Sequence, residues 1–435
     1  MAASTIIMMT ENYKKFNKIF TVLLRFVGTF AAFLMHFIVA IKLGASDAGV
    51  FYIVFAISSI ASTISRLGLD YAVTKFVSEY GSSNKAELVS YIYSFSVKAI
   101  ILTSIPITGL LLLANNILAI YVFKSPEMVP VLYVMTLGIL PYSLLIMTAH
   151  AFQGSGEIVL AIFYQVILHP LLMSVLFLTV FSEQGVKGAA LAFALSALIC
   201  FVAVSFVWFR KNTVRALKGD ITKTSILLVS IPILVSFLAQ QALQHTPILL
   251  LGIFATSEQT GVYSVVHRLA SVVSIAVIAA NFIVAPKAAS YFSLNEISKL
   301  QRVAHRGSEV SLVVGMPILL FLLFFSPFIL SLFGDEYIVG KLALVILLIG
   351  QVSNLLNGSG SVLLMMTAGQ NKFMQINIVG FIVCLVLSLV LIPIYESTAA
   401  AISVSIALCL INIRRYYAAK NIVGVSSLPR IPGLF

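Results

Sequence analysis

Two arginines lie inside long apolar stretches of the sequence, Arg25 near its start and Arg268 in its second half. An ionised side chain in hydrocarbon costs on the order of a few kcal/mol, so it normally faces a cavity or a partner. Carboxylates are nearly absent from these stretches. Because a guanidinium binds phosphate through paired donors, the two arginines predict a cavity for an anion. For Arg25 a second interpretation stays open, in which the side chain snorkels to the nearby membrane surface.

Three glutamines form a second candidate group. Gln240 and Gln241 precede Gln244 by four and three residues, so a helix would place them on one face, and His245 follows directly. Each amide offers donors and acceptors, which suits the hydroxyl groups of a sugar. The alternative is that these amides hydrogen-bond neighbouring helices inside the membrane. Their clustering in the middle of an apolar stretch favours a cavity lining.

Four further residues are candidates for binding or conformational control. His267, directly before Arg268, and Asn281 are weaker candidates for the same substrate cavity. Arg66 and Asp70 are four residues apart, which places them on one helical face and predicts a local ion pair. A role of this pair in gating or ion coupling is the alternative, and both interpretations stay open.

The elements that must position these residues follow from the composition. Of the 435 residues, 60% are hydrophobic and 10% are charged, whereas soluble domains average about 45–50% and about 25%. Such a chain lacks the polar residues to cover a soluble surface, so it is a polytopic integral membrane protein. Soluble enzymes, nucleic-acid-binding modules and secreted scaffolds are excluded. The cysteines all lie in apolar runs and predict neither a disulfide nor a metal site: Cys200, Cys384 and Cys409.

About twelve apolar runs are long enough for membrane helices, which need about 20 residues each. They are centred in 19–43, 48–68, 90–114, 129–149, 158–181, 188–209, 225–253, 260–286, 307–333, 341–368, 375–394 and 399–413. Turn residues separate them, as at Gly44-Ala45-Ser46-Asp47. The connecting loops are short, so we predict an all-α membrane protein without a separate catalytic domain or catalytic residues.

Lysine and arginine are unevenly distributed between the loops. With the N-terminus in the cytoplasm, most of the 27 fall on the cytoplasmic side of the predicted topology. Only four fall on the opposite side: Lys42, Lys124, Lys187 and Lys341. Positive charges concentrate in cytoplasmic loops, so the pattern predicts that both termini are cytoplasmic. It also explains the net charge of +12 without a nucleic-acid partner.

The two halves of the sequence match after a shift of 211 residues, the separation of Pro106 and Pro317. With one more residue of shift, Gly49-Val50-Phe51 matches Gly261-Val262-Tyr263. An even number of crossings in each repeat orients both halves alike. We therefore predict two parallel six-helix bundles, residues 1–212 and 213–435. In transporters built from parallel repeats, the substrate path lies between the bundles, which rock to give alternating access.

The chain resembles the bacterial polysaccharide-biosynthesis flippases, which carry O-antigen units and belong to the multidrug/oligosaccharidyl-lipid/polysaccharide exporter superfamily. The resemblance rests on motifs of small residues: Arg25-x-x-Gly28, Leu43-Gly44-(x)4-Gly49, Arg66-Leu67-Gly68, Gln153-Gly154, Gly261-x-Tyr263, Ala285-Pro286 and Leu332-Phe333-Gly334-x-x-Tyr337. It implies a V-shaped exporter fold of twelve helices, with helices 1, 2, 7 and 8 around a central cavity. It also implies that an oligosaccharide on undecaprenyl pyrophosphate is flipped from the cytoplasmic to the outer leaflet of the bacterial inner membrane. The related lipid II flippases usually have two more helices.

Two other functions stay open. A drug/cation antiporter of the same superfamily needs buried carboxylates, and we find none in the middle of a predicted span. A polysaccharide polymerase or similar membrane enzyme usually needs a large outer loop or paired catalytic acids. One acid pair, Asp335-Glu336, lies in a predicted outer loop, but a turn at a helix end explains it.

The energy source and the partners are predicted only in outline. The sequence has no GxxxxGK[ST] motif, so direct ATP hydrolysis is excluded and no cofactor is predicted. A Na⁺ or H⁺ gradient is left open, with Asp70, His245 or His267 as coupling groups. The expected partners are the lipid-linked oligosaccharide and membrane lipids. The polymerase and chain-length machinery of polysaccharide assembly are further expected partners.

Overall fold

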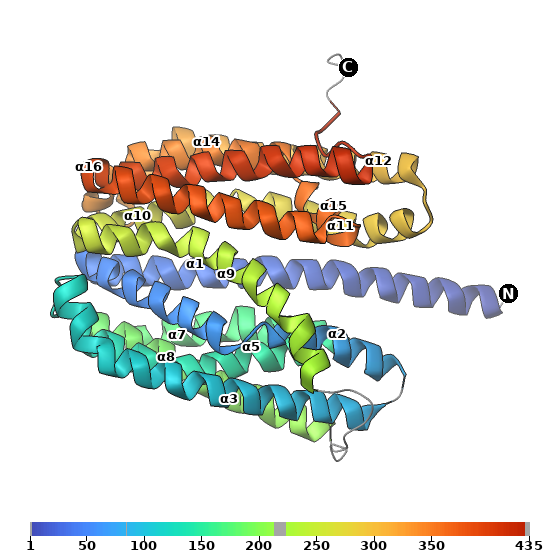
Figure 1. The fold of residues 1–435 in the computed structure, drawn as a ribbon, viewed down its shortest axis with the longest axis horizontal. Helices are drawn as coiled ribbons and strands as arrows, with labels where there is room; N and C mark the ends of the chain where they lie inside the picture. The colour runs from blue at the N-terminus through green and yellow to red at the C-terminus, as the bar shows by residue number, and fades with distance from the viewer. Residues whose placement is uncertain (1, 84, 213–222, 431–435) are drawn as a thin grey trace. The chain divides into compact units, whose positions relative to one another are not determined.

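The computed structural model describes the chain apart from residues 1, 84, 213–222 and 431–435, and apart from the side chains of residues 2–19, 22, 82 and 223. Its described part consists of helices joined by short turns and contains no strand (Figure 1). It divides into two compact units, unit 1 (Met1–Ile38, Ala61–Leu113 and Val134–Leu234) and unit 2 (Val39–Ile60, Ala114–Tyr133 and Val235–Phe435). The predicted all-α fold is confirmed.

The helical elements follow one another along the described chain as α1 (Ala2–Ser65), α2 (Leu69–Ser82), α3 (Ala86–Asn116), η1 (Ile117–Val122), α4 (Met128–Leu137), α5 (Ile139–Gly154), α6 (Ile158–Ile162), η2 (Phe163–Leu168), α7 (His169–Thr179), η3 (Ser182–Gln184), α8 (Gly185–Lys211), α9 (Lys223–Phe254), α10 (Ser257–Ser271), α11 (Ser274–Ser293), α12 (Ile297–Phe324), α13 (Ser326–Ser331), η4 (Asp335–Gly340), α14 (Lys341–Leu356), α15 (Gly360–Met366), α16 (Gln370–Ala418) and η5 (Ala419–Val423).

In the described residues, nine helical stretches are long and apolar enough to cross a membrane, and the bent pair α4–α5 makes up to ten. Two of these stretches are long enough to cross twice, because about 20 residues suffice: Leu23–Ser65 has 43 residues and Gln370–Val423 has 54. Each is interrupted at one non-helical residue, Gly44 in α1 and Glu396 in α16. A multi-pass membrane protein is thereby confirmed, while the number of twelve crossings stays a prediction.

The first predicted turn coincides with a break in the helix at Gly44. The element α1 comprises two helices that meet at a kink at Gly44, the first residue of the predicted turn at 44–47, whose φ is 71° and ψ is 174°. Glycine has no Cβ and adopts a positive φ readily, so one residue changes the direction of the chain. The predicted spans 19–43 and 48–68 are therefore the two parts of one kinked element.

Unit 1 has a core in which α2 packs on α5 and α5 packs on α8. Trp208 of α8 is almost completely buried and stacks on Tyr93 of α3, with ring centres 4.7 Å apart. Phe152 of α5 contacts the same indole edge-on at 5.1 Å. Aromatic pairs in these geometries add to the free energy gained by burial, so this aromatic cluster holds α3, α5 and α8 together.

The junction between α1 and α2 explains the Arg66-Leu67-Gly68 motif. Leu67 and Gly68 both have positive φ, at 52° and 70°. A Cβ on Gly68 would lie 2.3 Å from the carbonyl oxygen of Ser230 in α9, in the same unit. Only glycine fits both the backbone conformation and this close approach, so the motif marks a break where one helix ends against another.

Gly68→Ala is therefore expected to destabilise the protein by more than about 2 kcal/mol, because positive φ and a backbone collision act together. The matched control is Gly156→Ala. Gly156 also has a positive φ, of 85°, but a Cβ there would meet nothing within 4 Å, so we expect a loss of about 1 kcal/mol. Thermal unfolding of the purified variants in detergent measures both, and equal losses would contradict the steric argument.

Unit 2 is built around α11, α12, α14 and α16. α11 packs on α12, and α14 packs on α16, while α10 contacts both α14 and α16. The second part of α1 belongs to this unit and crosses α10 at two glycines. A Cβ on Gly49 would lie 1.8 Å from the carbonyl oxygen of Ser257, and a Cβ on Gly261 would lie 1.9 Å from that of Ala45. The two glycines that the sequence repeat aligns are thus in backbone contact with each other's helices.

The two units do not coincide with the two predicted bundles. Residues 39–60 and 114–133 lie in the first half of the sequence, but their contacts place them in unit 2. The predicted boundary at residue 212 borders residues 213–222, which lie outside the described residues. The division into two six-helix bundles therefore stays a prediction.

Candidate functional site

Arg268 packs against aromatic rings inside unit 2. Its guanidinium lies 4.4 Å from the ring centre of Tyr52 and 5.7 Å from that of Phe55, both on the second part of α1. His245 of α9 contacts the Phe55 ring, with 6.3 Å between ring centres. His267 of α10 lies within electrostatic range of His245. These five residues, from three helical segments, are called the Arg268 cluster below.

The sequence of α10 places Arg268 at the end of that helix. The hydroxyl oxygen of Thr256 caps the start of α10 by accepting a hydrogen bond from the Gln259 N–H at 3.1 Å, as is typical of threonine before a helix. Arg268 lies in the last turn. The carbonyl groups at this helix end are paired: those of Leu269 and Ala270 accept from backbone N–H groups, and that of Arg268 accepts from the Ser271 hydroxyl.

The charge of Arg268 has no anionic partner in the described part of the chain. Ion pairs between described residues include Arg66–Asp70, Lys211–Glu157 and Lys299–Glu296, and Arg268 takes part in none of them. Arg268 instead donates a hydrogen bond to the side chain of Tyr52, and its Nε is buried without a partner among the described residues. A half-buried guanidinium on aromatic rings attracts an anion, and its planar donors suit a phosphate.

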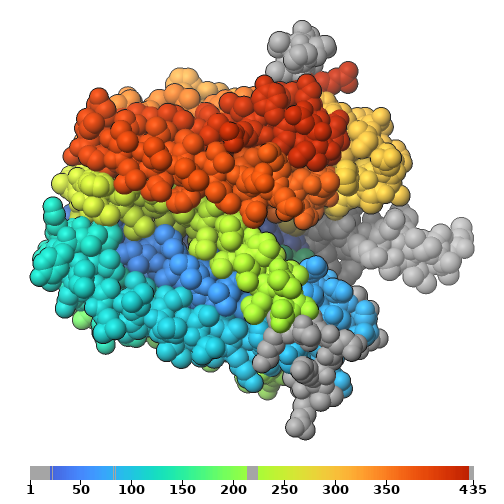
Figure 2. Space-filling model, in the orientation of Figure 1, coloured from blue at the N-terminus to red at the C-terminus, as the bar shows by residue number. Residues whose placement is uncertain are grey.

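The predicted glutamines lie on α9 but take no part in the Arg268 cluster. Gln240 and Gln244 are exposed and Gln241 is half-buried. Figure 2 shows α9, in yellow-green, at the surface of the visible face. Their role in binding a sugar stays a prediction, and so does the alternative of hydrogen bonds to neighbouring helices.

Asn281 lies on α11 and is half-buried. Its Oδ1 is buried and has no hydrogen-bond partner among the described residues. A buried amide oxygen without a partner is costly, so Asn281 is a site where a ligand hydroxyl or water would be favourable. Its role in substrate binding stays a prediction.

Arg25 belongs to unit 1, whereas Arg268 belongs to unit 2. The Arg25 side chain is half-buried on α1 and lies within electrostatic range of Tyr71. One turn further, a Cβ on Gly28 would lie 2.7 Å from the side chain of Val166 in the same unit, which explains the glycine of the Arg25-x-x-Gly28 motif. The shared cavity for the two arginines stays a prediction.

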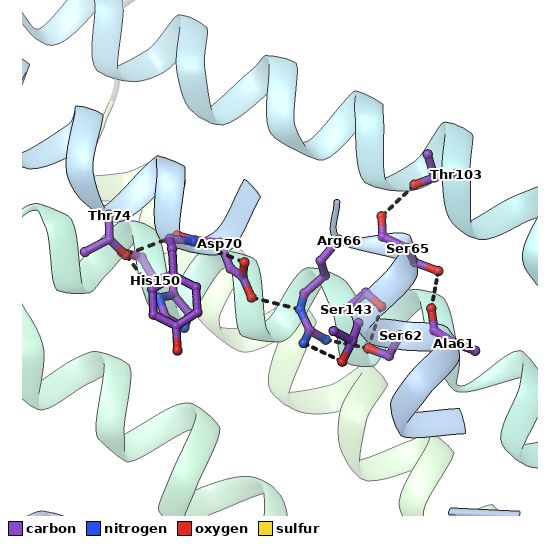
Figure 3. Close-up of polar contacts among 11 residues, drawn as sticks. Ala61, Ser62, Ser65, Arg66, Asp70, Thr74, Thr103, Ser143 and His150 are labelled. Carbon is purple, nitrogen blue, oxygen red and sulfur yellow. Dashed lines mark hydrogen bonds and ion pairs between the residues drawn. The ribbon is translucent and has the colours of Figure 1, made fainter. Parts of the chain in front are cut away.

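Arg66 and Asp70 form the ion pair that their spacing predicts. Figure 3 shows the Arg66 guanidinium between Asp70 on one side and Ser62 on the other. Nε of Arg66 donates to Asp70 Oδ2 at 3.0 Å, and its Nη atoms donate to Ser62 at 2.6 Å and Thr63 at 3.2 Å. The pair is buried, with 10% and 8% of the two side chains exposed. Every nitrogen of the guanidinium therefore has a partner, unlike those of Arg268.

The network around this pair extends across unit 1. Ser62 is hydrogen-bonded to Ser143 of α5 at 2.8 Å. Thr74 of α2 bonds His150 of α5 through the imidazole Nδ1 at 3.0 Å (Figure 3). The pair thus spans the α1–α2 break and is tied to α5 at both ends. Its role in gating or coupling stays a prediction.

Sequence reasoning missed the aromatic part of the Arg268 cluster. Tyr52 and Phe55 precede Arg268 by more than two hundred residues, and aromatic side chains are common in membrane helices. The one available signal was their position after Gly49, in the segment that the repeat aligns with Gly261. Ser143 and His150 were missed for the same reason, since only packing brings α5 to the α1–α2 break.

The chain is similar to known proteins in both sequence and fold. Residues 16–286 match the family described as polysaccharide biosynthesis protein. Curated proteins gave no match. An inward-facing multidrug resistance MATE family transporter of the MOP superfamily has a TM-score of 0.75 at 15% identity, covering 93% of this chain and 98% of that one. The lipid II flippase MurJ, in an inward closed conformation, also reaches 0.75, at 11% identity, covering 93% of this chain and 88% of that one.

A MOP superfamily transporter from Pyrococcus furiosus aligns with a TM-score of 0.69 at 16% identity, covering 94% of this chain and 95% of that one. At these identities the solved structures establish the fold. The family match extends over more than half of the sequence, and it agrees with the small-residue motifs found in the sequence. The chain belongs to the polysaccharide biosynthesis protein family and has the fold of MOP superfamily transporters.

Proposed function

We propose that this protein flips an oligosaccharide linked to undecaprenyl pyrophosphate, such as an O-antigen unit of lipopolysaccharide. The lipid would move from the cytoplasmic to the outer leaflet of the bacterial inner membrane by alternating access. The observation that carries the proposal is Arg268, a guanidinium without a carboxylate partner in the described chain, held on Tyr52 and Phe55. Family membership and the transporter fold support the general class.

The proposed chemistry is binding and charge compensation. A pyrophosphate carries negative charge that cannot cross a low-dielectric core uncompensated. Arg268 would bind it with paired donors, Arg25 would contribute a second charge, and the exposed amides of Gln240 and Gln244 would bind sugar hydroxyls. The buried Arg66–Asp70 pair would hold the α1–α2 break while the bundles rock, driven by a Na⁺ or H⁺ gradient.

The second candidate is a drug/cation antiporter, which the similarity of fold to a MATE transporter favours. Such a protein would need a negative site for a cationic substrate. Among the described residues, the buried carboxylate of Asp70 is already paired with Arg66. The Arg268 cluster carries a positive charge, which would repel a cation. A polymerase-type enzyme remains the third interpretation, and we favour it least.

Ligand-dependent thermal stabilisation of the purified protein separates these functions, because a ligand that binds the folded state raises its stability by mass action. The ligands are a short polyprenyl pyrophosphate, the corresponding polyprenyl alcohol and a lipophilic cation. We expect stabilisation by the pyrophosphate and little by the neutral alcohol. Stabilisation by the cation without a response to pyrophosphate would assign the protein to the antiporters instead.

The α9 amides give a more specific prediction. In the double variant Gln240→Leu/Gln244→Leu, a pyrophosphate lipid bearing an oligosaccharide is expected to bind roughly tenfold more weakly, because two hydrogen-bonding groups are lost. Binding of the sugar-free pyrophosphate lipid should not change. Gln375→Leu, at an exposed glutamine of α16, is the control. An equal loss for both ligands would mean that the amides do not recognise the sugar.

A further inference from the structure

The kink at Gly44 removes regular helical partners from neighbouring backbone groups, and residues of η4 replace them. A carboxylate oxygen of Glu336 accepts a hydrogen bond from the Ala45 N–H at 2.7 Å. The Tyr337 hydroxyl donates to the carbonyl oxygen of Ala40 at 3.3 Å. Tyr337 is completely buried, whereas Glu336 is exposed. The polar groups on both sides of the kink are therefore satisfied by a segment about 290 residues later in the chain.

The glycine crossing lies next to these bonds. Gly49 and Gly261 approach the opposite helix so closely that neither position has space for a Cβ. Such a contact joins two bare backbone surfaces without interlocking side chains. The side chains that flank the crossing, such as Phe51, Tyr52 and Val262, are almost completely buried, so separation of the helices would expose them. Water can replace a hydrogen bond to an exposed carboxylate. The hydrogen bond to Glu336 can therefore hold the helices together and exchange with water when they separate.

We propose that these contacts form a clasp that closes one end of the transport path and opens in each transport cycle. The Gly44 clasp comprises the Glu336–Ala45 bond, the Tyr337–Ala40 bond and the Gly49–Gly261 crossing. It joins residues 39–60, which the sequence repeat assigns to the first bundle, to the second half of the chain inside unit 2. This inference rests on the proposed transport function.

The distribution of lysine and arginine predicts on which side of the membrane the Gly44 clasp lies. Lys42 and Lys341, which flank the clasp in sequence, are among the few basic residues predicted on the non-cytoplasmic side. A closed clasp there would seal the outer end while a lipid-linked substrate is bound from the cytoplasm. Release to the outer leaflet would require the clasp to open.

Cysteine protection measures this opening directly. Val50 is 2% exposed and lies beside Gly49, so the smaller cysteine of Val50→Cys fits and reacts with a water-soluble maleimide only when the clasp opens. The native Cys384, also buried and in unit 2, reports unfolding in the same sample. Cys200 and Cys409 are replaced by alanine, and labelling of the full-length protein in lipid nanodiscs is followed by mass spectrometry.

Glu336→Ala is expected to speed labelling at position 50 about tenfold. The closed state loses its hydrogen bond to a charged acceptor, so the open state becomes more populated. Gly261→Ala should speed it further. Asp335→Ala, a loss of the same charge one residue away, should leave the rate unchanged. Rates at position 50 that stay at the parent value in both Glu336→Ala and Gly261→Ala would overturn the clasp. An equal acceleration at Cys384 would also overturn it, since unfolding would then explain the labelling.

The measurement separates this inference from the proposed function. A short polyprenyl pyrophosphate is added in a parallel set of samples. If the clasp opens as predicted but the pyrophosphate changes neither the labelling rate nor thermal stability, the clasp is retained and the proposed substrate is wrong. If the pyrophosphate stabilises the protein but labelling does not respond to Glu336→Ala, the substrate is retained and the clasp is wrong.

Discussion

A short polyprenyl pyrophosphate is expected to bind roughly 10- to 100-fold more weakly when Arg268 is replaced by alanine. Hydrogen bonds to charged groups contribute about 1.5–3 kcal/mol each, and about 1.4 kcal/mol corresponds to a factor of ten. Arg268 is the charged member of its cluster, so no neighbour can replace it there. Arg268→Lys keeps the charge but loses the planar fork, and it should retain part of the affinity.

The stability of the ligand-free variant distinguishes loss of binding from loss of fold. Arg268 has no anionic partner in the described chain and its Nε is buried without one, so alanine removes a charge that is costly to desolvate. We expect ligand-free Arg268→Ala to be at least as stable as the parent. Arg414→Ala, at an exposed arginine of α16, should bind the pyrophosphate normally. A variant that still binds at parental affinity would remove Arg268 from the proposed site.

Asp70→Ala is expected to give the largest loss of stability, about 3–5 kcal/mol. Removing one partner of a buried ion pair leaves an uncompensated charge in a poorly solvated position. Arg66 would lose its Asp70 acceptor and keep only the hydroxyls of Ser62 and Thr63. The guanidinium would then be held only by hydrogen bonds to two uncharged hydroxyls. Thermal unfolding in detergent, with the parent alongside, measures the change.

The control for this prediction is an exposed ion pair of the same protein. Glu296 and Lys299 have 35% and 50% of their side chains exposed, and exposed pairs contribute at most about 1 kcal/mol, so Glu296→Ala should have little effect. The double variant Arg66→Met/Asp70→Leu should recover most of the stability, because replacing both partners leaves no buried charge. A loss for Asp70→Ala no larger than for Glu296→Ala would show that the buried pair is not structural.

The sequence alone determined the class of protein and the local features. Composition requires a membrane, because there are too few polar residues to cover a soluble surface, and run lengths locate most spans. The Arg66–Asp70 pair was predictable because its two residues are four apart on one helix. Helix periodicity fixes such neighbours before any tertiary contact forms. The family resemblance could likewise be recognised from glycine positions, because few other residues fit where two backbones approach closely.

Tertiary structure decided which of these residues meet. Tyr52 and Phe55 reach Arg268, and Glu336 reaches Ala45 across 291 residues, and no periodicity encodes such pairs. They depend on how helices cross, which at Gly49 and Gly261 is set by the missing side chains of both partners. The break that the sequence predicted at residues 44–47 is made by one glycine with positive φ, which joins two helices without a longer loop. Local spacing constrains a single helix, whereas a site between helices is fixed only when the helices pack.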